Sequence, residues 1–321
     1  MGRSEPPPSP SPSLITVRLS AIKPIALDTR LFELTSAGGE PLPPAAPGAH
    51  IDLHLSEGLV RQYSLLTPLC TPSTYAIAVK REGAGRGGSR RLHDEIAMGS
   101  VLRVGEPRNH FALNESASET LLLAGGIGIT PILGMWERLR KLQRRVHLHY
   151  WCRSSEHSLF RDRLDTHPDA IIHYAAPGRA TLTSVLQRAA AHSELYCCGP
   201  VRMLEEFEDA TQLRPRQRVH LERFHNSPHA DPGTDFTVVL AKSGIEVLVR
   251  SGESILNALR DASVEVSYSC EEGVCGACEV RFLAGAPLHR DAVRSADEHD
   301  RLSTVMICCA RSRSERLTLD L

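Results

Sequence analysis

Four of the nine cysteines are spaced like the ligands of an iron–sulfur cluster. Cys270, Cys275 and Cys278 form the pattern C-x4-C-x2-C, and Cys308 follows after 29 intervening residues. This spacing matches the plant-type [2Fe–2S] ligand set. Zinc ribbons usually carry two C-x2-C pairs and this segment has only one, so a cluster is favoured over zinc and over ordinary buried thiols.

The remaining residues of this segment fit the same interpretation. Gly273 and Gly276 allow the backbone to wrap closely around a cluster and to point amide N–H groups at its sulfurs. Cys309 competes with Cys308 for the fourth position; the length of the gap favours Cys308 and puts Cys309 on the opposite face of an expected strand over 304–310. Three further cysteines are expected to be small buried hydrophobic residues, namely Cys70, Cys152 and Cys197.

A second group of residues could bind a planar, phosphorylated cofactor. In RQYSL, Arg61 offers positive charge to a phosphate, Tyr63 can cover a ring edge, and Ser64 can hydrogen-bond a ring nitrogen. The glycine-rich run 85–89 precedes an expected helix over 90–96, whose first amides could hold an anion. The alternative is a solvated strand followed by a flexible loop.

A third group is typical of nicotinamide coenzyme sites. In LLLAGGIGITP, Gly125, Gly126 and Gly128 would permit a tight strand-to-helix turn close to a pyrophosphate, although Pro131 stands where the fingerprint has its last glycine. Cys198, in YCCGP, ends a later strand and could lie beside a nicotinamide ring. Each motif alone could also be a purely structural turn or strand end.

Two structural patterns would position these residues. Between 14 and 113, six short strands broken by Gly and Pro predict an antiparallel β-barrel domain. Between 114 and 225, continuous apolar strands alternate with helices and predict a parallel sheet covered on both faces. The expected strands are 14–22, 30–36, 50–55, 61–66, 75–80 and 100–105 in the first domain and 119–125, 146–152, 170–176 and 194–199 in the second. The helices expected in the second domain are 131–142, 155–163, 182–190 and 203–210.

The C-terminal segment 236–321 predicts a small α+β domain. A hairpin is expected from 235–241 and 245–251, a helix from 254–261, and later strands at 278–285, 304–310 and 316–321. The polar stretch 226–235 is interpreted as a linker, and the Pro/Ser-rich segment 1–13 as a disordered tail.

Composition excludes several classes of protein. Lys plus Arg total 37 against 38 for Asp plus Glu, a net charge of −1, which gives no electrostatic footprint for nucleic acid or an anionic membrane. The 41% of hydrophobic residues argues against a disordered chain. No apolar leader follows Met1 and no membrane-length apolar run is present, so we expect a cytoplasmic protein.

Together these motifs resemble the phthalate dioxygenase reductase family, which includes vanillate demethylase reductases. The resemblance extends from Leu14 to Leu321. It rests on the cysteine pattern and on RQYSL, AVKR, GRGGS, AGGIGITP, YCCGP, the later His289–Asp291 with Arg294 and Ser295, and the terminal LTLDL. It implies a multidomain fold with a flavin barrel, an α/β NAD domain and a C-terminal ferredoxin domain of the plant type (β-grasp).

The resemblance also implies cofactors and the residues that bind them. The cofactors would be FMN, a [2Fe–2S] cluster and NADH. Arg153, after the second strand of the NAD domain, could touch the adenosine ribose or a 2′-phosphate. Arg223 departs from the small residue expected between Glu222 and Phe224, both of which would lie near the flavin. The other implied contacts are Arg61, Tyr63, Ser64, Leu65, Lys80, Arg81, Gly88 and Ser89 for FMN, and Gly125, Gly126, Gly128, Thr130, Cys198, Gly199 and Pro200 for NADH.

The implied function is electron transfer. Electrons would pass from NADH through FMN and the cluster to a Rieske non-haem iron oxygenase, as the reductase component of an aromatic-ring dioxygenase or O-demethylase in aromatic hydrocarbon catabolism. No side-chain acid, base or nucleophile is required, and a monomer is expected. Alternatives are a reductase for a haem monooxygenase and a redox-sensing iron–sulfur module. The aromatic substrate would be bound by the oxygenase and not by this component.

Overall fold

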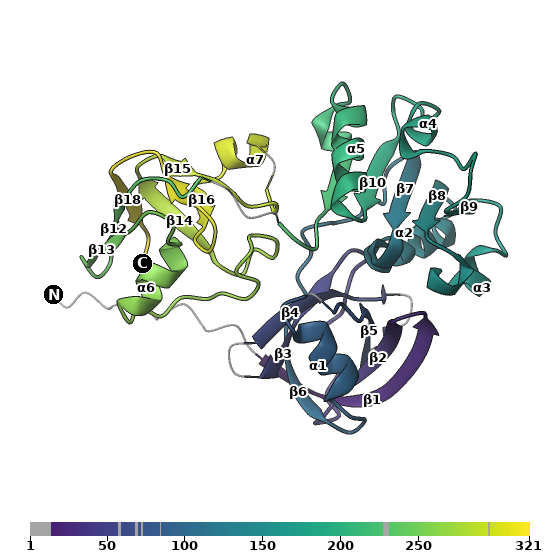
Figure 1. Ribbon diagram of the computed structural model, residues 1–321, viewed down its shortest axis with the longest axis horizontal. Coiled ribbons are helices and arrows are strands. Elements are labelled where there is room, and N and C mark those ends of the chain that lie inside the picture. Colours follow the sequence, from purple (N-terminus) through teal and green to yellow (C-terminus); the bar gives the residue numbers. More distant parts are fainter. Residues whose placement is uncertain are drawn as a thin grey trace. The chain divides into compact units, whose positions relative to one another are not determined.

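The computed structural model describes residues 14–56, 59–67, 70–71, 73–83, 85–226, 231–294 and 296–321. It forms two compact units, one built mainly from Thr16–Leu102 and Pro107–Asn226 and the other mainly from Ser227–Leu321 (Figure 1). The predicted tail over 1–13, the middle of the predicted linker and Ser295 lie outside the described residues. No helix in the described part of the chain is long and apolar enough to cross a membrane.

The first unit begins with the predicted antiparallel barrel, which is confirmed. Its six strands follow the order β4-β3-β6-β1-β2-β5. An antiparallel bridge between Leu65 and Ile77 joins the chain after β4 to β5, so the two ends of the sheet meet. The strands are β1 (Leu14–Ala26), β2 (Thr29–Ser36), β3 (His50–Ser56), β4 (Leu59–Ser64), β5 (Thr74–Lys80) and β6 (Val101–Gly105).

One helix, α1 (Gly88–Asp94), lies between β5 and β6. It begins two residues before Arg90, the start that the sequence predicted. Gly87 adopts φ +86 at the N-cap, a left-handed conformation that glycine reaches without a steric penalty, so the turn into the helix is completed there.

The same unit contains the predicted parallel sheet, which is also confirmed. Its order, β11-β10-β7-β8-β9, matches the 3-2-1-4-5 order of dinucleotide-binding sheets, and all four strand pairs are parallel. The strands are β7 (Glu119–Gly125), β8 (Arg145–Cys152), β9 (Ala170–Tyr174), β10 (Glu194–Cys198) and β11 (Val219–Glu222), the last of which the sequence did not reveal.

Helices cover both faces of this sheet because its strands are apolar on both faces. The helix α2 (Ile129–Lys141) packs its Ile132 and Trp136 on one face, in a core that also includes Leu31 and Ala78 of the barrel. The helices α4 (Leu182–Leu186) and α5 (Val201–Thr211) pack on the other face. The shared core explains why the predicted barrel and NAD domains form one compact unit.

Two predicted helices are shorter than expected. The helix predicted over 155–163 is broken into a 3₁₀ turn, η3 (Ser155–His157), and α3 (Arg161–Leu164), because Ser158 is extended and Phe160 has φ +57. The helix predicted over 182–190 ends at Leu186. Just beyond this helix end, the Arg214 guanidinium donates hydrogen bonds to the carbonyls of Ala189 and Ala190.

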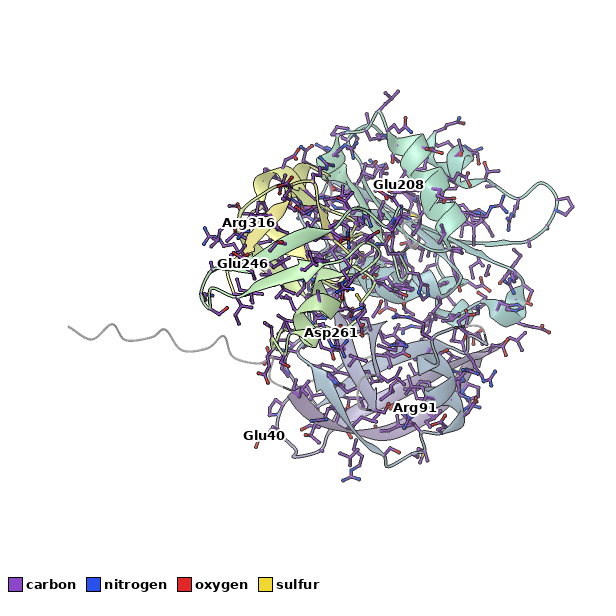
Figure 2. The ribbon with its side chains drawn as sticks, turned by 60° about the vertical axis from the view of Figure 1, so that its left-hand side comes forward. Glu40, Arg91, Glu208, Glu246, Asp261 and Arg316 are labelled. Atoms are coloured by element: carbon purple, nitrogen blue, oxygen red, sulfur yellow. The ribbon has the colours of Figure 1, made fainter. Side chains whose placement is uncertain are left out.

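The second unit is the predicted α+β domain. Its main sheet has the order β13-β12-β18-β14-β16, with β12 and β18 parallel. Arg316 of β18 and Glu246 of β13 form an ion pair across β12 (Figure 2). Its larger elements are β12 (Phe236–Leu240), β13 (Glu246–Val249), α6 (Ile255–Asp261), β14 (Glu279–Ala284), α7 (Ala296–Arg301), β16 (Thr304–Met306) and β18 (Arg316–Leu319), with the short pair β15 (Pro287–Leu288) and β17 (Arg311–Ser312).

Candidate functional site

The four cysteines of the predicted cluster site lie together in the second unit. Cys270, Cys275 and Cys278 stand in the long loop between α6 and β14, and Cys308 follows β16. All four side chains are buried. The Cys270 thiol lies within interaction distance of those of Cys275 and Cys308, and the Cys308 thiol within that of Cys278. The two parts of the chain that carry the pattern therefore meet at one point.

Backbone donors surround these sulfurs. The N–H groups of Glu272 and Val274 donate to Cys270 Sγ at 3.3 and 3.4 Å, and that of Ala277 donates to Cys275 Sγ at 3.4 Å. These backbone hydrogen bonds favour negative charge on the Cys270 and Cys275 sulfurs. Donors that favour the thiolate form are what a metal cluster needs from its ligands, so the loop fits a [2Fe–2S] cluster.

The conformation of the loop depends on glycine. Gly273 has φ +71, and a Cβ there would lie 2.5 Å from Cys309 Sγ and 3.1 Å from the Cα of Asp291. Gly276 has φ +73. Any larger side chain at Gly273 would therefore push the ligand loop away from the segments that hold it.

The position of Cys309 differs from the prediction. The strand expected over 304–310 ends at Met306, and the next three residues form a turn in which the N–H groups of Cys309 and Ala310 both reach the Met306 carbonyl. Cys309 is therefore not on the opposite face of a strand. It packs against Gly273 and forms one wall of the ligand loop.

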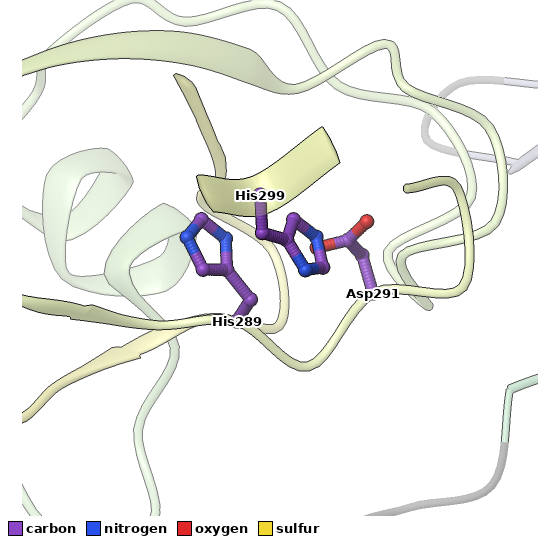
Figure 3. Close-up of side chains that lie close together, drawn as sticks. All are labelled: His289, Asp291 and His299. Carbon is purple, nitrogen blue, oxygen red and sulfur yellow. The ribbon is translucent and has the colours of Figure 1, made fainter. Parts of the chain in front are cut away.

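A buried carboxylate supports the other side of this loop. The Asp291 side chain is 1% exposed, and it accepts from His299 Nε2 at 3.0 Å and from the Arg294 N–H at 3.0 Å (Figure 3). The next N–H, of Ala292, donates to the Gly273 carbonyl at 2.8 Å. Asp291 thus holds the backbone that in turn holds the ligand loop.

His289, Asp291 and His299 do not form a metal site in this arrangement, although their ligand atoms lie within 4.8 Å of one another. The two imidazole rings are stacked, with centroids 3.9 Å apart and planes 10° from parallel (Figure 3). A metal ion lies in the plane of each imidazole that binds it, and two stacked planes share no such point. The sequence singled out His289 and Asp291 but missed His299, which lies on a different element and has no spacing signal.

In the barrel, the predicted flavin residues gather at the start of α1. The Arg61 side chain runs beside Gly88, where a Cβ would lie 2.4 Å from Arg61 Cγ. Its guanidinium donates to the carbonyls of Val60 and Arg86 at 2.7 and 2.6 Å. The side-chain hydroxyl of Ser89 accepts from the Glu82 N–H at 3.0 Å. An arginine, a glycine and a helix start therefore meet as phosphate binding requires.

The other predicted flavin contacts are either largely shielded from solvent or already in ion pairs. Tyr63 is half-buried, and burial raises its pKa; Ser64 and Leu65 are buried. Lys80 and Arg81 lie on the same edge, but Lys80 pairs with Glu82 at 2.5 Å and Arg81 pairs with a carboxylate of α1 at 2.7 Å. Their charges are thus balanced within the protein.

The predicted nicotinamide loops meet where β7 and β10 are neighbours. A Cβ on Gly125 would lie 3.3 Å from the Gly199 Cα, and a Cβ on Gly128 would lie 2.3 Å from the Cys198 carbonyl oxygen. These glycines therefore allow the two strand ends to pack together. Gly126 differs, because it has φ +53 and open space around it. Gly126 is thus the position at which a coenzyme could approach the backbone.

Thr130 and Pro200 flank these loops. The Thr130 hydroxyl is buried and donates to the Ile127 carbonyl at 3.0 Å, which stabilises the first turn of α2. Pro200 is the N-cap of α5, and its Cδ would lie 2.6 Å from a Cβ on Gly125.

A buried acid lies beside the β10 loop. Cys198 and Glu222 are register partners on β10 and β11, so their side chains share one face of the sheet. Burial raises the pKa of Glu222 to about 8, and its Oε2 atom has no hydrogen-bond partner among the described residues. Phe224 packs against the same core, and Arg223 points its charge elsewhere, to Glu208 of α5. An unsatisfied buried carboxyl fits a position next to a bound cofactor.

Comparison with known proteins gives matches over both parts of the chain. Residues 122–209 match the oxidoreductase NAD-binding domain family, and residues 238–313 match the 2Fe-2S iron-sulfur cluster binding domain family. Phenoxybenzoate dioxygenase subunit beta from Ectopseudomonas oleovorans is 42% identical over 96% of this chain and 97% of its own.

Two solved structures are also similar. The structure of phthalate dioxygenase reductase, described as modular for electron transfer from pyridine nucleotides to [2Fe–2S], is 38% identical, with a TM-score of 0.69 over 96% of this chain and 98% of that one. An intact type IV self-sufficient cytochrome P450 monooxygenase is 36% identical, with a TM-score of 0.89 over 99% of this chain. The chain spans 43% of the length of that second protein.

Glu222 should make stability depend on pH. Its carboxyl stays protonated in the folded protein up to about pH 8, whereas it ionises near 4.5 when unfolded. The folded state therefore binds the extra proton between these values, and the free energy of unfolding falls as pH rises, by up to roughly 1.4 kcal/mol per pH unit. Urea unfolding at several pH values should show that Glu222→Gln removes this slope.

The exposed Glu205 of α5 provides the matched control. Glu205→Gln should retain the wild-type slope. An unchanged slope in Glu222→Gln would mean that this carboxyl is already ionised in the folded protein.

Asp291 should affect retention of the cluster. Asp291→Asn weakens a hydrogen bond to a buried charged group, typically worth about 1.5–3 kcal/mol, and so loosens the segment that holds Gly273. We expect the visible absorbance of the cluster to be lost several-fold faster in the presence of an iron chelator. Asp300→Asn, on the exposed side of α7, should lose absorbance at the wild-type rate. Equal rates for both variants would contradict a supporting role for Asp291.

Proposed function

This chain belongs to the phthalate dioxygenase reductase family, and we propose that it is the reductase component of a two-component, Rieske-type aromatic-ring dioxygenase or O-demethylase. It is an NADH-dependent flavin and iron–sulfur oxidoreductase. The relatives that match over nearly their full length include other dioxygenase and demethylase reductase subunits.

One observation carries this proposal. A single chain contains both a dinucleotide-type sheet and a cluster of four buried thiols, two of which receive backbone hydrogen bonds. NADH gives up two electrons as a hydride, whereas a [2Fe–2S] cluster accepts one at a time; when bound, FMN supplies the conversion between the two. The barrel with Arg61 and Gly88 is the part of the chain suited to that cofactor.

The residues of the chain would bind and orient the cofactors. Arg61 and the amides after Gly87 would hold the FMN phosphate, and Tyr63 and Ser64 would line the ring. Gly126 would admit the NADH pyrophosphate. Cys198, Pro200, Glu222 and Phe224 would shield the nicotinamide from water. No residue needs to act as a nucleophile, so the chain would contribute orientation and electrostatics.

Reduction potentials favour a Rieske partner. Plant-type clusters have potentials near about −400 mV, and Rieske centres lie between roughly −150 and +300 mV. The smallest of these gaps, about 250 mV, corresponds to roughly four decades in the equilibrium constant for one electron. Transfer to a Rieske oxygenase would therefore be strongly downhill.

We further propose that the protein acts as a cytoplasmic monomer in the catabolism of aromatic compounds.

A haem monooxygenase is the second candidate partner. The specific observation is the likeness of the whole chain to less than half of a self-sufficient cytochrome P450 monooxygenase. Mixing the NADH-reduced protein with a purified Rieske oxygenase or with a cytochrome P450 would separate the two candidates. Reoxidation by the Rieske protein alone supports the first, and reoxidation by the P450 alone supports the second. A protein that binds a cluster but no flavin would instead indicate a redox sensor.

Replacing one cluster ligand should separate two activities. Cys275→Ser should abolish NADH-dependent reduction of cytochrome c, which needs the cluster, but leave reduction of ferricyanide, which needs only the flavin. Cys70→Ser, at a half-exposed cysteine of the barrel, should retain both activities. If Cys275→Ser also retained both, the proposed electron order would be wrong.

A further inference from the structure

The carboxyl end of β8 is where dinucleotide-binding sheets recognise the adenosine ribose. In sheets of the 3-2-1-4-5 order, the pyrophosphate binds at the turn after the first strand, and a residue near the end of the second strand contacts the ribose 2′ position. An acidic residue there suits the 2′-hydroxyl of NADH, and an arginine suits the 2′-phosphate of NADPH. Here β7 is the first strand and β8 is the second. The chain that leaves β8 reads Arg153-Ser154-Ser155-Glu156.

A second arginine reaches the same edge of the sheet. The Ala175 N–H donates to the Arg153 carbonyl at 3.3 Å, so the chain leaving β9 runs beside Arg153. The Trp151 indole N–H donates to the Ala180 carbonyl at 2.9 Å, which folds the next loop back toward the end of β8. Arg179 lies in that loop. Both arginines therefore belong to one short stretch of the sheet edge.

The positive charge of Arg179 acts on His173 at this edge of the sheet. The His173 ring stacks on Trp151 with centroids 4.7 Å apart. Burial, and then the positive charge of Arg179, lower the pKa of His173. The guanidinium of Arg179 is thus near the ends of both β8 and β9, not displaced into distant solvent.

Neither guanidinium has a partner among the residues that the structure describes. Arg153 and Arg179 are exposed, and within the described part of the chain neither forms an ion pair or a side-chain hydrogen bond. Neighbouring arginines are different, because Arg161 pairs with Asp165 and Arg163 pairs with Glu137. Two unpaired guanidinium groups at one edge of the sheet suit a ligand with two negative charges.

We propose that Arg153 and Arg179 bind the 2′-phosphate of NADPH, so that the protein accepts NADPH as well as NADH. The proposal rests on the proposed function, because the coenzyme must occupy the turn after β7. Glu156, the one carboxylate of this segment, remains available to the 2′-hydroxyl of NADH. The two coenzymes have the same nicotinamide, so both deliver the same hydride. With ferricyanide, one NADPH and two ferricyanide ions give NADP⁺, two ferrocyanide ions and one proton.

Two measurements on the holoprotein test this assignment. The first compares kcat/KM for NADPH and NADH with ferricyanide as acceptor. The second is calorimetric titration with 2′,5′-ADP and with 5′-AMP, which needs no turnover. We expect NADPH to be used within about a hundredfold of NADH, and 2′,5′-ADP to bind at least about tenfold more tightly than 5′-AMP, as expected for charge-assisted phosphate contacts.

Three substitutions test the residues. Arg153→Ala and Arg179→Ala should each lower the ratio of kcat/KM for NADPH to that for NADH by about tenfold, and should weaken binding of 2′,5′-ADP relative to 5′-AMP. Arg145→Ala is the matched control, because Arg145 is exposed at the opposite end of the same strand. It should leave both ratios unchanged.

The outcomes separate this inference from the proposed function. One outcome would overturn the inference alone. In it, NADH is active, kcat/KM for NADPH is more than about a hundredfold lower than for NADH, and 2′,5′-ADP binds no more tightly than 5′-AMP. NADPH use that is insensitive to both arginine substitutions would overturn the assignment of these residues. Failure of both coenzymes to reduce ferricyanide would overturn the proposed function itself.

Discussion

Holding four sulfur ligands together, three from one loop and the fourth from the segment after β16, is the constraint on which the second unit depends. Thiolates repel one another, and burial alone raises the pKa of a thiol. The loop between α6 and β14 counters both effects by turning its own N–H groups toward Cys270 and Cys275. That arrangement requires the left-handed conformation at Gly273, and Gly273 in turn has room only for hydrogen between Cys309 and Asp291.

The first unit meets a related constraint with similar means. Two strand ends must come close enough to receive one extended coenzyme, and side chains would keep them apart. Gly125, Gly128 and Gly199 remove that obstacle, so the backbones of β7 and β10 pack directly. The glycines that the motif predicted to lie beside a pyrophosphate thus divide into two groups. Most serve strand packing, and Gly126 alone combines a positive φ with open space.

The sequence predicted the architecture because the signals it used are local. Strand alternation, glycine turns and cysteine spacing each depend on neighbouring residues, and they led to the barrel, the parallel sheet and the α+β domain. The features that it missed depend on contacts between distant segments. His299 supports Asp291 from another element, β11 becomes a strand only by pairing with β10, and a turn at Met306 moves Cys309 beside Gly273.

The near-neutral charge of the chain has a structural counterpart. With 37 basic and 38 acidic residues, long-range attraction to a partner is weak, so encounter would depend on short-range fit and not on steering. Many arginines are already paired, including Arg81 with Asp94 and Arg138 with Glu115. Because ion pairs within the protein are so common, an arginine that has no carboxylate partner points to a candidate ligand contact. Its charge has been left available, and in a parallel sheet the carboxyl edge is where an anionic ligand would use it.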